Sequence, residues 1–109
     1  MARATILIFA GCLISAAAAS AQDLARGEKV YADQKCGLCH SIGDKGNKKG
    51  PLDGVGAKLS ATDIRAWMVD APGMTEKTKS ARKPVMKSYA LPKDDLDALV
   101  AYLASLKKK

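Results

Sequence analysis

The hydrophobic positions at the C-terminal end of the chain recur at the spacing of a helix. From Pro92 onward, apolar residues repeat on one predicted helix face. They are Leu96, Leu99, Val100, Leu103 and Leu106. Pro92 suits the first turn of a helix, and the acidic pair Asp94-Asp95 suits its positive end. We therefore predict a helix from this proline almost to the C-terminal lysines.

Two further helices are predicted upstream from their capping residues. Asp23 is a candidate cap for a helix that runs to about Gln34. Its inward-facing positions are Leu24, Gly27, Val30 and Tyr31. Ser60-Ala61-Thr62-Asp63 resembles a capping box and opens another helix through Val69, which Pro72-Gly73 is expected to end.

The segments between these helices are predicted to be loops. Residues 43–56 contain five glycines, Pro51 and several lysines. Residues 74–91 are polar and basic, and Pro84 opposes a continuous helix, so we expect a long loop with room for one helical turn. Loops of this length in compact domains tend to be functional. No β-strand alternation and no internal repeat is recognisable.

The first 21 residues differ in character from the rest. Arg3 precedes the apolar stretch 4–19, which ends in the small-residue pattern Ala19-Ser20-Ala21. This order is typical of a secretory signal peptide with its cleavage site. A retained membrane anchor is the less favoured alternative, because the stretch is short for a crossing of ~20 residues and no positive cluster follows it. We predict cleavage after residue 21 and a mature domain over residues 22–109.

Cys12 lies inside the predicted signal, and we interpret it as an ordinary residue of that segment. Its surroundings faintly resemble a lipoprotein cleavage box, but cutting there would leave the apolar run 13–19 on the mature protein. The mature domain then has only Cys36 and Cys39. In an oxidising compartment such a pair usually forms a disulfide.

The mature chain is small and basic. Losing Arg3 with the signal lowers the net charge by one unit from +7, to +6. A basic surface suits acidic partners. Nucleic acid is not an expected partner, because the chain has only four arginines and no clustered aromatic platform. With few aromatic residues in a domain of this size, a non-protein group is a candidate for the centre of the core.

The motif Cys36-Gly37-Leu38-Cys39-His40 carries the clearest chemistry in the chain. A C-x-x-C-H motif is typical of c-type haem attachment. Thiols three positions apart on a helical turn are neighbours, so both can add to the two vinyl groups of one porphyrin. The histidine directly after them then reaches the iron as its proximal ligand. We predict one covalently bound haem c.

Other uses of the two cysteines lack supporting features. A structural zinc site needs four ligands, and no further Cys or His follows His40. Thioredoxin-like exchange places its cysteines after a strand, and none is predicted before Cys36. Thiol exchange and a plain disulfide remain as alternatives that a haem stain would separate from haem attachment.

From this motif onward the mature sequence resembles the class I c-type cytochromes. The resemblance implies an all-α fold of three or four helices wrapped around one haem. In that family the first and last helices cross through a close contact of glycine and aromatic residues. Gly27 with Tyr31, and Leu99 with Tyr102, stand at the matching spacings. The crossing would explain Gly27, since glycine weakens a helix interior.

The resemblance also implies a methionine as the sixth iron ligand. His40 is the only histidine, and the mature chain offers Met68, Met74 and Met86. Met68 lies on a predicted helix and is expected in the core. In related short cytochromes the ligand precedes the last helix in a segment similar to that of Met86. We therefore predict Met86, with Met74 as the alternative.

Two further residues match family positions near the haem. A proline after the motif offers its carbonyl to the proximal imidazole, and Pro51 stands there; a simple loop turn is its alternative role. Trp67 resembles the helix tryptophan whose indole N–H reaches a haem propionate, and a buried core position is nearly as well supported.

These observations predict an electron carrier of the periplasm, not an enzyme. The free protein is expected to be monomeric, to meet the membrane only through its partners unless the signal is retained, and to dock on acidic redox proteins. The lysines expected near the haem are Lys45, Lys48, Lys49, Lys77, Lys79, Lys83 and Lys87. A solvated basic face is an equally supported role for them. A permanent haem subunit of a larger oxidoreductase complex, and a gas sensor or enzyme with a loose distal ligand, are the alternative functions.

Overall fold

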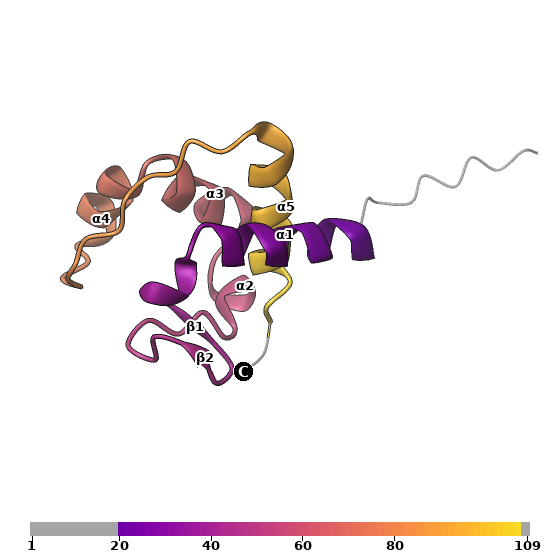
Figure 1. Cartoon of the computed structure of the whole chain (residues 1–109). Helices are drawn as coiled ribbons and strands as arrows, with labels where there is room; N and C mark the ends of the chain where they lie inside the picture. The colour runs from indigo at the N-terminus through magenta and orange to yellow at the C-terminus, as the bar shows by residue number, and fades with distance from the viewer. Residues whose placement is uncertain (1–19, 108–109) are drawn as a thin grey trace, which may run out of the picture.

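The computed structural model describes residues 20–107, which form the predicted all-α fold (Figure 1). The helices are α1 (Ala21–Asp33), α2 (Val55–Lys58), α3 (Ala61–Val69), α4 (Ala71–Thr78) and α5 (Lys93–Ala104). A short 3-10 turn, η1 (Cys36–Leu38), precedes two short antiparallel strands, β1 (Ser41–Ile42) and β2 (Lys45–Gly46). Most of the predicted signal, including Cys12, lies outside the described residues. Within residues 20–107 no helix is both long and apolar enough to cross a membrane.

Helices α1 and α5 cross at closest approach through Gly27, as the family resemblance implied. A Cβ atom at this position would overlap the Ala98 carbonyl and the Tyr102 side chain. The rings of Tyr31 and Tyr102 meet edge to face with centroids 6.2 Å apart. The crossing thus fixes the two ends of the chain against each other (Figure 1).

The hydrophobic core packs against the α1–α5 crossing, and one side of it borders a cavity. Its buried members come mainly from α1, α3 and α5, and they are Val30, Ile64, Met68, Leu99, Val100 and Leu103. Met68 is therefore in the core, as predicted. Half-buried apolar side chains, among them Trp67 and Met86, pack against this cluster and continue it toward a cavity.

The N-terminal cap of α1 differs from the prediction. The Ser20 hydroxyl accepts a hydrogen bond from the Asp23 amide at 3.1 Å, so the cap is Ser20, and the prediction that Asp23 caps the helix was wrong. Asp23 lies in the first turn, where its charge faces the positive end of the helix. The predicted cleavage after Ala21 would remove Ser20, and with it this hydrogen bond.

The second predicted helix begins after its Ser60 cap and ends at Val69, as expected, but the Pro-Gly pair is not what ends it. Ser60 caps α3 by accepting from the Asp63 amide at 3.1 Å. After Val69 the Asp70 carboxylate accepts from the Gly73 amide at 3.2 Å and starts α4, with Pro72 in its first turn. The prediction of a loop from residue 74 was therefore wrong up to Thr78. The true loop covers residues 79–92.

The glycine-rich stretch 43–56, which was predicted to be loop, contains β2 and α2. Both strands have only two residues, too few for any alternation to be recognised. Gly43 and Gly46 have positive φ angles of 59° and 100°, which glycine adopts without strain. Ser41 also forms a parallel bridge with Pro51, so the stretch folds back beside the C-x-x-C-H motif.

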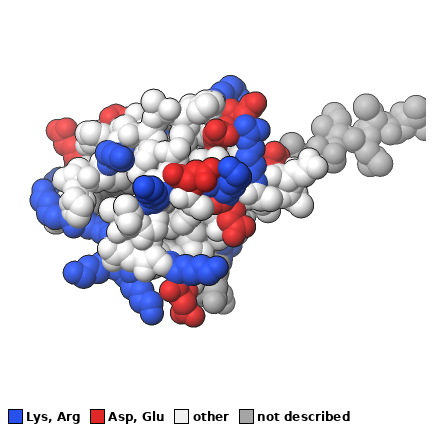
Figure 2. Space-filling model, viewed as in Figure 1, with Lys and Arg blue, Asp and Glu red and all other residues white. Residues whose placement is uncertain are grey.

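Charged side chains are unevenly spread over the face shown in Figure 2. Lys and Arg side chains gather along its left and lower margins, where α4, the 79–92 loop and the β1–β2 hairpin lie. Acidic side chains mix with basic ones toward α1 and α5. Three of the four ion pairs within residues 20–107 include Asp95 or Asp97 of α5.

Candidate haem site

A cavity of about 670 Å³ opens between the η1 turn, α3 and the 79–92 loop. This volume lies in the ordinary range for small-molecule and cofactor sites. Among the predicted site residues, the cavity is lined by Cys36, Cys39, His40, Trp67 and Met86. Pro51 and Met74 are not part of its lining. The fold thus brings together five residues that span half of the chain.

The η1 turn presents the two cysteines and the histidine. The amides of Cys39 and His40 both donate to the Cys36 carbonyl, at 3.1 and 2.9 Å. This tight turn begins at Lys35, which adopts the left-handed conformation with φ 57°. Both thiols are free and half-buried. Both line the same cavity, as attachment to one porphyrin requires.

The environment of Cys36 does not favour thiol exchange. Burial raises the pKa of the Cys36 thiol, whereas reactive thiols have a lowered pKa. Within residues 20–107, α1 and not a strand precedes the motif, unlike the thioredoxin-like arrangement. In the same part of the chain, no three His, Cys, Asp or Glu side chains gather as a metal site.

His40 is held by the carbonyl of Gly50, and not by that of Pro51. Its Nδ1 lies 3.0 Å from the Gly50 oxygen. The prediction for Pro51 was wrong by one residue, because Ser41 pairs with this segment: the Ser41 amide donates to Gly50 and the Leu52 amide donates to Ser41. This pairing directs the Gly50 carbonyl toward the imidazole. Pro51 itself is exposed and forms the parallel bridge with Ser41.

The surroundings of His40 favour a neutral imidazole that is able to bind a metal. Burial lowers its pKa, the Gly50 hydrogen bond opposes that effect, and the positive charge of Arg82 lowers the pKa further. With Nδ1 donating to Gly50, Nε2 is the nitrogen left to serve as a ligand.

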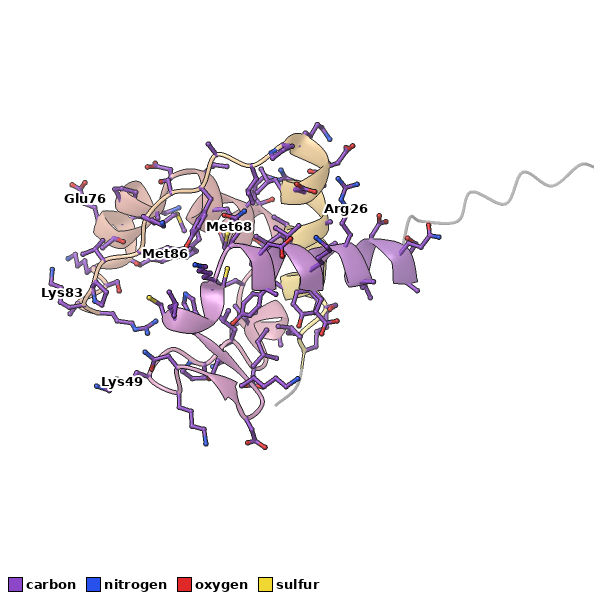
Figure 3. The ribbon with its side chains drawn as sticks, in the orientation of Figure 1. Arg26, Lys49, Met68, Glu76, Lys83 and Met86 are labelled. Carbon is purple, nitrogen blue, oxygen red and sulfur yellow. The ribbon has the colours of Figure 1, made fainter. Side chains whose placement is uncertain are left out.

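Met86 and Met74 have different surroundings. Met86 is half-buried on the cavity wall, and Figure 3 places it near Met68 in the interior of the molecule. Met74 is 8% exposed within α4, away from the cavity lining. Just beyond Met86, the Tyr89 amide donates to the Met68 carbonyl at 2.7 Å and the Ser88 hydroxyl accepts from the Ala71 amide at 3.0 Å. The loop after Met86 is therefore anchored to α3 and α4.

The comparison with protein families agrees with this geometry. A family model described as Cytochrome c matches residues 24–107. The chain belongs to the cytochrome c family. Membership implies binding of haem c and a role in electron transfer. No curated protein and no solved structure gave a match.

The donors and walls of the cavity in this cytochrome fit a haem group. Two adjacent thiols, a neutral imidazole and a thioether are the side chains that hold haem c. The Tyr31 hydroxyl is buried at the cavity without a hydrogen-bond partner in the described chain. Burial, with a smaller effect of Cys36, raises the pKa of Tyr31 to about 12. A group that fills the cavity would lie against this hydroxyl.

Three residues at the cavity were not predicted from the sequence. Tyr89 lines it and is half-buried, and burial raises its pKa. Lys35 adds a basic residue to the rim. Arg82 also lines the cavity, and its guanidinium donates to the Cys39 carbonyl. No local pattern marks these residues, because the cavity is formed by segments that lie far apart along the chain.

The position of Trp67 is compatible with both roles that the sequence left open. It packs against the core cluster and also lines the cavity. Its contact with a haem propionate therefore stays a prediction.

Proposed function

We propose that this cytochrome is a monohaem, outer-sphere carrier of single electrons. Its haem would be attached through Cys36 and Cys39, with the iron between His40 and Met86. The observation that carries the proposal is the shared cavity, in which these four side chains line the walls of one space. The chain has a single C-x-x-C-H motif and a single histidine, so one haem is the number that it can hold in this way.

The side chains around the cavity suit electron transfer rather than substrate chemistry. Bound haem c would supply one redox-active iron. His40 and Met86 would fill both axial positions and leave no site for a substrate. A thioether favours Fe(II) over Fe(III), so Met86 would raise the reduction potential relative to two nitrogen ligands. The Gly50 carbonyl would keep the His40 ring in one orientation, and the apolar wall of Leu52, Val55 and Leu59 would exclude water.

The rim of the cavity supports docking of an acidic partner protein. The seven lysines predicted near the haem are all exposed, and Lys35 and Lys87 line the opening itself. Figure 3 places Lys49 and Lys83 at the outer margin on the same side of the molecule. Leu38 and Val85, which are 72% and 45% exposed, add apolar surface at the opening. Basic residues around an apolar centre are complementary to an acidic surface with an apolar centre.

Export to the periplasm is part of the same proposal and rests on the sequence of residues 1–21. The predicted monomeric state is consistent with a carrier that meets several partners in turn.

One spectrum tests the proposal. The native protein should show the absorption bands of a low-spin haem c, oxidised and then reduced, and a denaturing gel should keep the haem on the polypeptide. Carbon monoxide should not bind at neutral pH, because both axial positions are filled. Ready binding of carbon monoxide would favour a gas sensor or enzyme instead, and a gel without haem would favour thiol chemistry.

A further inference from the structure

Arg82 makes the bond that joins the 79–92 loop to the haem-attachment turn. The guanidinium donates to the Cys39 carbonyl, 43 residues away in sequence. It also lies against Gly50, where a Cβ atom would overlap it. Its charge is close enough to His40 to contribute to the lowered pKa of the imidazole, after burial as the main cause. One side chain thus touches Cys39 and Gly50 on the proximal side of the site.

The part of the loop from Ala81 to Met86 depends on Arg82 for its hydrogen bonding to the rest of the described chain. Within the described chain, residues 81–87 make a single hydrogen bond outside their own segment, and it is the one from Arg82. The bonds of Tyr89 and Ser88 hold the loop only on the far side of Met86. Without Arg82, the stretch from Ala81 to Met86 would have no hydrogen bond to the rest of the described chain.

The charge of Arg82 is not used in an ion pair among residues 20–107. All four ion pairs of that region lie on α1, α3 and α5 and involve other residues. Because arginine keeps its charge and offers several donors in a fixed plane, it can bind a carbonyl while remaining positively charged. A hydrogen bond from a charged donor is stronger than a neutral one.

We propose that Arg82 is a positioning residue that clamps the loop carrying Met86 onto the Cys36–His40 turn. The clamp fixes the distance between the two sides of the cavity, so that Met86 stays opposite the proximal histidine. The effect of this clamp on the iron rests on the proposed His40–Met86 ligation. The hydrogen bond from Arg82 to Cys39 itself is formed within the polypeptide. The positive charge beside His40 also disfavours further positive charge at the iron, which raises the reduction potential.

Hydrogen exchange of the haem-loaded protein tests the clamp. In Arg82→Gln, the Tyr89 amide, which donates to the Met68 carbonyl where the loop meets α3, should exchange about tenfold faster, as loss of one charge-assisted hydrogen bond from the same loop implies. Arg82→Lys keeps a charge and one donor and should give a smaller increase, about threefold. Arg26→Gln is the matched control, because it removes the same charge from an exposed pair with Asp95 on the α1–α5 side. It should leave exchange of the Tyr89 amide unchanged.

Two spectroscopic measurements separate a clamp from a general loss of stability. On heating, Arg82→Gln should lose the red charge-transfer band of Met-ligated ferric haem before its helical circular dichroism falls, while the wild type and Arg26→Gln lose both together. The reduction potential of Arg82→Gln should be lower than that of Arg82→Lys under conditions where both variants show the charge-transfer band at equal intensity. Exchange of the Tyr89 amide that is the same in Arg82→Gln and Arg26→Gln would overturn the proposal.

Making the Arg82→Gln change in the Met86→Ala protein as well as in the wild type distinguishes the clamp from the ligand assignment. In Met86→Ala, the Arg82→Gln change should still speed exchange of the Tyr89 amide, because the bond to Cys39 does not depend on the iron. If Met86→Ala keeps the charge-transfer band, the ligand assignment fails while the clamp stands. If the band is lost in Met86→Ala but Arg82→Gln has no effect on exchange in either background, the clamp fails alone.

Discussion

The Nδ1 atom of His40 lies 3.0 Å from the carbonyl oxygen of Gly50. This contact decides which residue orients the proximal imidazole, because Pro51 next to it is exposed and is not part of the cavity lining. The same carbonyl also accepts from the Ser41 amide at 3.1 Å. Backbone pairing between the motif and residues 50–52 therefore holds the ring, and no side chain is needed for it.

Replacing Pro51 with Ala should accordingly leave the proximal side intact. We expect the visible spectrum and the reduction potential to stay close to those of the wild type, with at most a small loss of stability, about 0.5–1 kcal/mol, from a more flexible unfolded chain. Potentiometry and denaturant unfolding check both quantities. A large fall in potential would restore the proline to the role that the sequence first suggested.

Gly27→Ala should destabilise the protein strongly for its size. The added methyl group has no space between the Ala98 carbonyl and Tyr102, and forcing α1 away from α5 costs about 1–3 kcal/mol or more. Urea unfolding followed by circular dichroism gives the free energy. The neighbouring exposed position provides a control, because Glu28→Ala should change stability by no more than about 0.5 kcal/mol.

Removal of both attachment cysteines should prevent proper folding. The double change Cys36→Ala and Cys39→Ala leaves the cavity of about 670 Å³ without a covalently held group, and a bound cofactor stabilises only the native state. We expect a colourless, poorly folded product after export, seen by circular dichroism and by a haem stain. Leu38→Ala changes an exposed side chain of the same turn and should keep both haem and fold. A compact apo-protein that unfolds cooperatively would contradict this expectation.

Electron transfer with an acidic partner should slow steeply as salt rises. Exposed charges are screened beyond ~8 Å at physiological ionic strength, and the lysines on the cavity side are exposed. Lys83→Gln should lower the association rate about twofold at low salt, as stopped-flow mixing would measure. Lys29→Gln, on α1 and paired with Asp33, should not. If the electron-transfer rate does not depend on salt, these lysines contribute only to solvation of the surface and not to docking.

Local patterns explain what the sequence predicted correctly. The apolar repeat of α5, the cap at Ser60 and the glycine at the helix crossing each depend on residues close together or on a tight steric requirement. The errors have local causes too. Ser20 and Asp23 are both good caps, and Pro72-Gly73 is compatible with a helix end as well as with the first turn of α4.

Long-range pairing explains what the sequence did not reveal at the site. The choice between Gly50 and Pro51 depends on how Ser41 pairs with a segment ten residues later. The contact of Arg82 with Cys39 depends on the path of an entire loop. Gly50 did carry a hint, because a glycine is required where the Cys39 carbonyl and the Arg82 guanidinium approach this closely.

The last prediction concerns the sixth ligand, for which the cavity separates the two candidates. Met86 lines the space that also contains His40, whereas Met74 is buried in α4 outside it. Met86→Ala should abolish the red charge-transfer band of the ferric protein, lower the reduction potential and let carbon monoxide bind. Met74→Ala should keep the charge-transfer band and the reduction potential and should still not bind carbon monoxide. It should only lower the unfolding free energy, by about 2–3 kcal/mol for a buried methionine. The measurements should be made where circular dichroism shows both variants folded. Loss of the band in Met74→Ala alone would reverse the assignment while keeping the cytochrome fold, and retention in both would point to lysine or water on the distal side and to a different mechanism.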